Sequence, residues 1–229
     1  MDRGDGNVTL TSGGLLMRPW REDDLPALLR AYADPAMRRW LATQVHGADG
    51  AARWLESRRT EWAAGTRFAF AVTESGREAG RDGGREAGRD GGREAGRDGE
   101  PLGNVVLKRP DPVSDCAEVG YWTTAQARGR GVASRALTAL TDWAFTHFAE
   151  QGLRRLELLH QVDNEASCRV AERCGYPLAR VIPALPPDYP LDGHVHVREA
   201  PATEEATLRR PERRRAEAAG TGGGRASGR

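Results

Sequence analysis

Lysine is almost absent from this chain of 229 residues, and features that mark several large protein classes are missing as well. The three cysteines include no Cys-x-x-Cys pair, so the sequence favours neither a disulfide framework nor a metal site. No apolar run approaches the ~18 residues of a membrane span. The start of the chain, Met1–Gly6, is too polar for a signal peptide. We therefore expect a cytoplasmic protein without membrane attachment.

Neither sign of charge is in excess. The formal net charge is +1 and the isoelectric point is near 7.8, which gives no global attraction to nucleic acid or anionic membranes. Three arginines at 213–215 stand among glutamates, a pattern that is more typical of a solvated tail than of a nucleic-acid contact. We expect no nucleic-acid partner.

Two segments are too poor in large apolar residues to form a core. Gly76–Gly99 repeats the octapeptide Gly-Arg-Glu-Ala-Gly-Arg-Asp-Gly three times, and 200–229 is rich in Arg, Glu, Gly and Ala. Neither buries enough surface to offset chain entropy. We expect a flexible N-terminus over 1–14, a folded domain over 15–199 and a disordered or weakly helical tail. The repeat falls between strand-like runs, 68–72 and 102–107, where lengthening a turn costs only ~0.6 kcal/mol per doubling.

The most informative stretch is Arg128–Ser134, which joins a strand-like run to a helix-like run. Glu118–Thr123 alternates as a half-buried strand does, and apolar residues then recur at helical spacing, at 133, 136, 137, 140, 144 and 148. Glycines in the loop let the backbone approach a ligand, and the start of a helix favours an anion such as a diphosphate. Val132 after Gly131 excludes a nucleotide P-loop, and Ser134 replaces the third glycine of the dinucleotide fingerprint.

Arg128, Gly131 and Ala133 form an Arg-x-x-Gly-x-Ala pattern that resembles the pyrophosphate motif of the GNAT superfamily of acetyl-CoA-dependent N-acetyltransferases. Further blocks stand in that family's order: a strand-like run, the start of a helix and the end of that helix, at Arg155–His160, Asn164–Ser167 and Glu172–Tyr176. The run Leu16–Trp20, followed by an acidic helix start, resembles the branch of the ribosomal-protein N-terminal acetyltransferases. The resemblance extends over about 15–197, apart from the repeat.

The resemblance implies an α/β fold with a mixed, mostly antiparallel central sheet, flanked by helices and splayed at the cofactor site. We expect strands over 15–18, 68–73, 102–108, 117–123, 155–160, 179–182 and 194–198, and helices over 23–33, 34–41, 49–64, 131–149 and 164–174. In the family the splay lies between the strands ending here at Trp122 and His160, and the pantetheine arm occupies it like another strand. The cofactor-binding residues implied are Tyr121, Trp122, Arg128, Gly129, Arg130, Gly131, Val132, Ala133, Ser134 and Asn164.

Acetyl transfer to an amine needs a base for the amine proton and an acid for the departing thiolate. Glu118 is the candidate base, directly or through water, because it lies on the strand that lines the acceptor channel in the family; its alternative is a solvent-facing strand carboxylate. Ser167 is the candidate acid, because it matches the serine of the ribosomal-protein branch and Ala171 stands where many relatives have a tyrosine. Its alternative is a first-turn residue that satisfies free N–H groups. Tyr176 is a second candidate acid, although aromatics in such places usually pack in a core.

Three other polar features have simpler interpretations. Asn164 is a helix N-cap, a pantetheine contact, or both. Cys168 adjoins Ser167, but the sequence places no histidine beside it, so we interpret it as a buried structural thiol. His194 and His196 share one face of a strand and could bind a metal, but two ligands without a third are weak evidence, so the simpler interpretation is ordinary sheet histidines.

We therefore expect an enzyme that moves an acetyl group from acetyl-CoA to a primary amine, on a peptide N-terminus or a small molecule. An α-amino group with a pKa of ~7.8 is roughly a tenth neutral at pH 7, a far larger fraction than for a lysine side chain. It therefore depends less on a catalytic base. The variable segments Leu41–Asp49 and Pro183–Asp192, including Tyr189, would form the acceptor pocket. A non-catalytic acyl-CoA sensor is the alternative function, and the chain would act as a monomer or homodimer.

Overall fold

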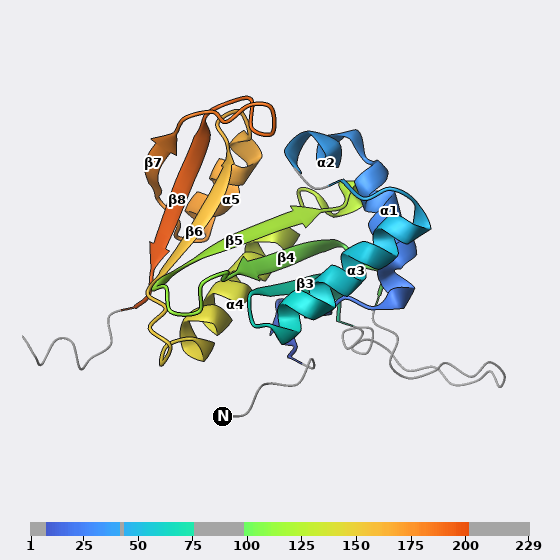
Figure 1. Ribbon diagram of the computed structural model, residues 1–229, viewed down its shortest axis with the longest axis horizontal. Helices are drawn as coiled ribbons and strands as arrows, with labels where there is room; N and C mark the ends of the chain where they lie inside the picture. The colour runs from blue at the N-terminus through green and yellow to red at the C-terminus, as the bar shows by residue number, and fades with distance from the viewer. Residues whose placement is uncertain (1–7, 42–43, 76–98, 202–229) are drawn as a thin grey trace, which may run out of the picture.

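Five antiparallel strands form the first arm of the sheet (Figure 1). The computed structural model describes residues 8–41, 44–75 and 99–201. The first arm follows the order of the sequence: β1 (Leu10–Ser12), β2 (Leu15–Pro19), β3 (Arg67–Glu74), β4 (Gly103–Lys108) and β5 (Cys116–Thr123). The pairing of β3 with β4 confirms that the repeat lies between neighbouring antiparallel strands.

Three more strands form the second arm. β6 (Arg155–Gln161) lies beside β5, and β8 (Gly193–Glu199) and β7 (Leu178–Ile182) follow it to the edge of the sheet. β5 and β6 are parallel, whereas β6 with β8 and β8 with β7 are antiparallel. The described residues thus form one eight-stranded sheet that is mixed and mostly antiparallel, which confirms the predicted fold class.

The two arms separate where β5 and β6 stop pairing. The register runs from Cys116 opposite Arg155 to Val119 opposite Leu158 and then ends, although both strands continue. Residues 120–123 of β5 therefore have β4 on one side and no strand on the other. In Figure 1 the two arms diverge from this point toward α2. This is the splay that the sequence predicts between the strands ending at Trp122 and His160.

Helices α4 (Val132–His147) and α5 (Glu165–Arg173) cover the same face of the sheet. The apolar stripe of α4 includes Leu137, Leu140 and Ala144, and it packs with Phe68 and Phe70 of β3 in one buried cluster. The residues that end α5 belong to the same cluster, so α4 and α5 share a core. Helical spacing of these apolar residues explains why one stripe is buried and the other side of each helix is polar.

The other face of the first arm is covered by α1 (Leu25–Ala33), α2 (Pro35–Trp40) and α3 (Gly47–Ala63), after a 3-10 turn at Glu22–Asp24. Trp20, Trp54 and Trp122 meet there, with ring centres 5.2 and 5.8 Å apart. Residues of β3 alternate between the two cores, with phenylalanines toward α4 and alanines toward α3. The first arm is therefore buried on both faces.

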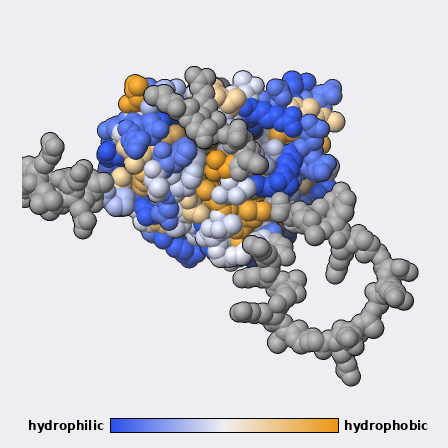
Figure 2. Space-filling view, turned by 90° about the horizontal axis from the view of Figure 1, so that it is seen from below, coloured by the Kyte–Doolittle hydropathy of each residue, from blue (hydrophilic) through white to orange (hydrophobic). Residues whose placement is uncertain are grey.

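The boundaries of the folded region differ from the prediction at the N-terminus. We expected 1–14 to be flexible, but β1 lies in that segment, where Leu10 pairs with Met17 and Ser12 with Leu15. Only 1–7 lie outside the described residues there, as do 76–98 of the repeat and 202–229 of the tail. No helix in the described ranges is long and apolar enough to cross a bilayer. In Figure 2 hydrophilic residues cover the flanks of the lower face, and hydrophobic residues gather near its middle.

Candidate active site

The loop between β5 and α4 has the backbone geometry of an anion site. After a 3-10 turn at Ala125–Ala127, Gly129 and Gly131 adopt φ angles of 74° and 72°, in the left-handed region that favours glycine. Gly131 immediately precedes α4, so the first helical N–H groups, from Val132 on, have no carbonyl partner within the helix. Such groups bind anions well. A Cβ added at Gly131 would lie 3.2 Å from Arg135 Nη1, so the turn also leaves little room for a side chain.

The two loop arginines are exposed, and each pairs with an acid on another element. Arg128 pairs with Asp34, whose side chain also caps the start of α2. Arg130 pairs with Glu74 at the end of β3, with 2.5 Å between nitrogen and oxygen. These ion pairs connect the loop to both α2 and β3, and the charge of each arginine is offset by its acid.

The residues at the start of α4 differ in exposure. Val132 and Ser134 are buried, whereas Ala133 is partly exposed. The Ser134 hydroxyl has no hydrogen-bond partner among the described residues. The side chain of Val132 therefore belongs to the core, and any contact of Val132 with a diphosphate would have to come from its backbone N–H.

Tyr121 and Ser167 come together beside the splay. Tyr121 lies on the part of β5 that β6 no longer covers, and its hydroxyl donates to Ser167 Oγ at 3.1 Å. Burial raises the pKa of Tyr121 to about 12, and the bond to Ser167 opposes this only partly. Tyr121 is therefore protonated at neutral pH and remains a donor to the serine.

Asn164 takes the capping role that was the alternative for Ser167. Its side-chain Oδ1 accepts from the Ser167 backbone N–H at 3.2 Å, which satisfies one free N–H group at the start of α5. The hydroxyl of Ser167 is thus not used for capping and bonds to Tyr121 instead. The prediction that Asn164 is an N-cap is confirmed, and its contact with pantetheine stays a prediction.

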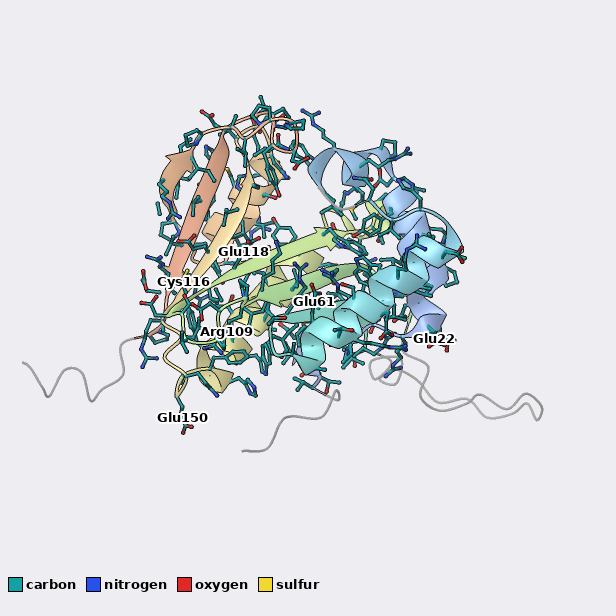
Figure 3. The ribbon with its side chains drawn as sticks, in the orientation of Figure 1. Glu22, Glu61, Arg109, Cys116, Glu118 and Glu150 are labelled. Atoms are coloured by element: carbon teal, nitrogen blue, oxygen red, sulfur yellow. The ribbon has the colours of Figure 1, made fainter. Side chains whose placement is uncertain are left out.

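Glu118 forms an ion pair with the only lysine of the chain. Lys108 lies directly opposite it on β4 and bonds to Glu118 Oε1, with the two side chains 32% and 38% exposed. Figure 3 labels Glu118 on β5 close to the point where the two arms diverge. Both interpretations of Glu118 stay open, because this carboxylate is half-buried and has a cationic partner.

Glu118 and Ser167 lie on opposite faces of the sheet. Side chains alternate along a strand, so Glu118 shares a face with Trp122, which packs in the core under α3. Tyr121 points to the other face, where it packs against the core under α4 and meets Ser167. A molecule lying along the free edge of β5 would have the carboxylate on one side and the hydroxyl pair on the other.

The order of these elements and blocks can be compared with known proteins. A family model described as "Acetyltransferase (GNAT) domain" matches residues 14–177. The chain belongs to this GNAT family. Strand β2, the loop between β5 and α4 (the phosphate-type loop) and the Asn164–Tyr176 block all fall inside the matched region.

Relatives of this GNAT domain include ribosomal-protein acetyltransferases. Over 78 residues, 34% of the chain, it is 38% identical to the ribosomal-protein-serine acetyltransferase of Escherichia coli (strain K12), and it spans 41% of that relative's length. A solved ribosomal-protein α-N-acetyltransferase bound to coenzyme A superposes with a TM-score of 0.66 at 20% identity, covering 84% of this chain and 98% of that one. A Salmonella typhimurium acetyltransferase that modifies the N-terminal serine of a 50S ribosomal protein gives 0.61 at 22%, covering 82% and 96%. The structural matches show the fold.

Two aromatic residues of the GNAT domain lie in its core. Tyr176 is fully buried, and its hydroxyl shares a 2.6 Å hydrogen bond with Thr141 of α4, which agrees with the core-packing interpretation. The Trp122 side chain is also buried and lies 6.0 Å, centre to centre, from Tyr32. That Trp122 binds cofactor stays a prediction, and with this side chain buried the contact would come from the Trp122 backbone at the free edge of β5.

A cluster of three histidines and a cysteine was not foreseen. His160 of β6, Cys168 of α5, and His194 and His196 of β8 place one potential ligand atom each within 4.8 Å of one another. Cys168 Sγ lies 3.2 Å from His194 Nδ1 and 3.6 Å from His160 Nε2. The interpretation of Cys168 as a buried thiol without a histidine neighbour is therefore wrong: it is partly exposed and has two. We call these four residues the His/Cys cluster.

Burial shifts the pKa of two members of the His/Cys cluster. It lowers the pKa of His160, although the hydrogen bond to the Gln161 carbonyl opposes the shift. It also raises the pKa of Cys168, with Glu172 and Glu165 adding to the effect. Both shifts favour the uncharged form of the group.

Of the two segments predicted to form the acceptor pocket, Leu41–Asp49 joins α2 to α3 and Pro183–Asp192 joins β7 to β8. Pro183–Asp192 contains a small bridge between Leu185 and Tyr189, and Tyr189 is exposed. Residues 42–43 of the other segment lie outside the described part of the chain. Arg39 of α2 forms an ion pair with Asp163, which precedes α5, with 2.6 Å between Arg39 Nη2 and Asp163 Oδ2. This pair connects α2 to the second arm.

Proposed function

We propose that this chain transfers an acetyl group from acetyl-CoA to the α-amino group of a protein N-terminus. The observation that carries the proposal is the Tyr121–Ser167 hydrogen bond beside the free edge of β5, because this hydroxyl pair adjoins the edge along which we expect the cofactor to bind. The relatives that act on ribosomal proteins support the choice of acceptor. Small-molecule amines are the alternative acceptors.

The cofactor would be held mostly by the backbone. The first N–H groups of α4, with Gly129 and Gly131 in the left-handed region, suit a diphosphate. Arg128 and Arg130, now paired with Asp34 and Glu74, would contact the diphosphate only after exchanging these partners. The uncovered edge of residues 120–123 offers N–H and C=O groups to an extended pantetheine arm, as an exposed sheet edge does to a peptide.

Proton transfer would use both faces of the sheet. Glu118 removes a proton from the amine as its nitrogen bonds to the thioester carbonyl carbon, directly or through one water. Ser167 donates its hydroxyl proton to the sulfur as the carbon–sulfur bond breaks. Tyr121, which donates to Ser167, stabilises the negative charge that develops on the serine oxygen, and water returns the proton from Glu118 to Ser167 at the end of the cycle. The products are the acetylated amine and the free thiol of coenzyme A.

A peptide assay tests the proposal. The purified chain is incubated with acetyl-CoA and a peptide that begins with serine and contains no lysine, and the mass gain of one acetyl group is followed. The same peptide with a blocked N-terminus is the control. We expect acetylation of the free peptide only, and Tyr121→Phe should slow it by roughly 10-fold or more, within the range of proton-transfer effects. Tight binding of acetyl-CoA without turnover of any amine would instead support the sensor.

A further inference from the structure

We propose that the His/Cys cluster is a metal site that binds one borderline-soft divalent cation, with zinc as the best fit. Its residues come from three elements of the second arm: His160 from β6, Cys168 from α5, and His194 and His196 from β8. Three imidazole nitrogens and one thiolate are ligands that such cations prefer, and four protein ligands make a closed site. The proposal does not depend on acetyl transfer.

The distances within the cluster are close to those of a tetrahedral site. With metal bonds of about 2.0–2.1 Å to nitrogen and 2.3 Å to sulfur, the ligand atoms of a tetrahedron lie roughly 3.3–3.6 Å apart. Cys168 Sγ lies 3.2 and 3.6 Å from two histidine nitrogens. The ring centres of the histidines are 5.1, 5.4 and 6.0 Å apart, so the three rings are mutual neighbours. The widest ligand separation, within 4.8 Å, requires side-chain movements of about an ångström.

Backbone carbonyls orient two of the rings. His160 Nδ1 lies 2.8 Å from the Gln161 carbonyl, and His196 Nδ1 lies 3.0 Å from the Tyr176 carbonyl. A carbonyl only accepts, so each Nδ1 carries the proton and each Nε2 presents a lone pair. The same arrangement fixes the orientation of metal-bound histidines in proteins.

His196 provides the second, independent observation. Its side chain is 1% exposed, and its Nε2 is buried without any hydrogen-bond partner. A buried acceptor without a partner is costly and requires an explanation such as an unseen ion. The single S–H proton of Cys168 can satisfy only one neighbouring nitrogen, so hydrogen bonding within the cluster does not account for three imidazoles. One cation would satisfy all of them.

The position of the site suggests what bound metal does for the fold. Helix α5 lies over one face of the second arm, and the metal would tie α5 to both β6 and β8 through side chains. Cys168 directly follows Ser167, so the same ligation would fix the first turn of α5. We therefore expect metal to stabilise the second arm.

Cobalt and zinc titrations of the full chain, first stripped with a chelator, test the site. We expect one cobalt per chain, with the absorption of tetrahedral cobalt and a thiolate-to-cobalt charge-transfer band. Zinc at a hundredfold excess over its Kd should raise Tm by roughly 5–10 °C. Zinc should also protect Cys168 from alkylation, as mapped by mass spectrometry.

Paired variants separate the cluster from unspecific binding. Cys168→Ser should remove the charge-transfer band and weaken zinc binding by more than the roughly 10- to 100-fold that loss of an outer partner costs. Cys116→Ser removes a partly exposed cysteine outside the cluster and should change neither. His194→Gln should weaken binding, whereas His46→Gln, at an exposed histidine, should not. Substoichiometric cobalt binding, or equal affinity for the Cys168 and Cys116 variants, would overturn the proposal.

Discussion

The two arms of the sheet differ in how many of their faces are covered. The first arm has α4 on one face and α1 and α3 on the other, and β3 is buried along almost its whole length. The second arm has α5 on one face, and its edge strand β7 leaves Leu178 and Val181 50% and 53% exposed. Apolar burial therefore stabilises the first arm much more than the second.

The candidate site takes residues from both arms. The phosphate-type loop and Glu118 belong to the first arm, where a closed core fixes the backbone. Ser167 and the His/Cys cluster belong to the second arm, whose edge strand β7 is mostly exposed. Only four residue pairs, from Cys116–Arg155 to Val119–Leu158, join the arms by strand pairing. The following predictions test how cofactor binding and proton transfer are distributed over the two arms.

The largest effect is expected in the second arm. Ser167→Ala removes the proposed proton donor, so kcat should fall by roughly 10²- to 10⁴-fold, while the Kd of acetyl-CoA stays nearly unchanged. Steady-state kinetics and calorimetry measure the two quantities. A loss of cofactor affinity with normal kcat would reverse the division, making the second arm the binding arm.

The next effect concerns the end of the first arm. Gly131→Val forces a β-branched residue to a φ of 72° and disturbs the N–H groups at the start of α4. Acetyl-CoA affinity should fall roughly 10²-fold, which corresponds to one or two lost charge-assisted hydrogen bonds. Gly152→Val is the matched control, because Gly152 has a φ of 84° but lies in the turn between α4 and β6. Equal affinity losses in both variants would indicate general strain.

A smaller effect is expected at Glu118. Glu118→Gln should lower kcat/KM by roughly 10-fold at pH 7, and the defect should shrink at higher pH, where more of an α-amino group is already neutral. Glu157→Gln is the control, because it removes the neighbouring carboxylate on β6 and should leave the pH profile unchanged. A parallel pH profile for Glu118→Gln and the unmodified chain would exclude the carboxylate as the base.

The smallest effect is expected at Tyr176. Tyr176→Phe removes one buried hydrogen bond to Thr141, so the free energy of unfolding should fall by about 1 kcal/mol and Tm by about 2–4 °C. The kcat should not change. Normal stability with a large loss of kcat would transfer the role of acid from Ser167 to Tyr176.

Much of the fold was predictable because its signals are local. The alternation in β5 and the stripe of α4 are periodic patterns, and both elements lie within two residues of the predicted ends. The strand β1 was missed because three residues, Leu10–Ser12, are too few to show a period. It forms only because β2 offers its edge to Leu10 and Ser12.

The candidate site was predictable only where its contacts follow from neighbouring residues. Asn164 caps a helix that begins at the next residue, so the spacing to Ser167 was sufficient. The His/Cys cluster depends on the register of β8 against β6, which places His194 opposite His160. His160 has no other histidine near it in the sequence, so no motif indicated a metal ligand at this position. Similarly, the pairing of Lys108 with Glu118 requires the register of β4 against β5.

The ion pair between Lys108 and Glu118 allows the state of Glu118 to be followed by chemical labelling of Lys108. Lys108 is the only lysine, so an amine-selective reagent has a single side chain to modify. Its ammonium is bound to Glu118 and only about one third of the side chain is exposed, so labelling requires the pair to open. Anything that draws the carboxylate away, including an incoming amine, releases Lys108 for modification. The labelling rate at this one residue therefore measures how often Glu118 is free.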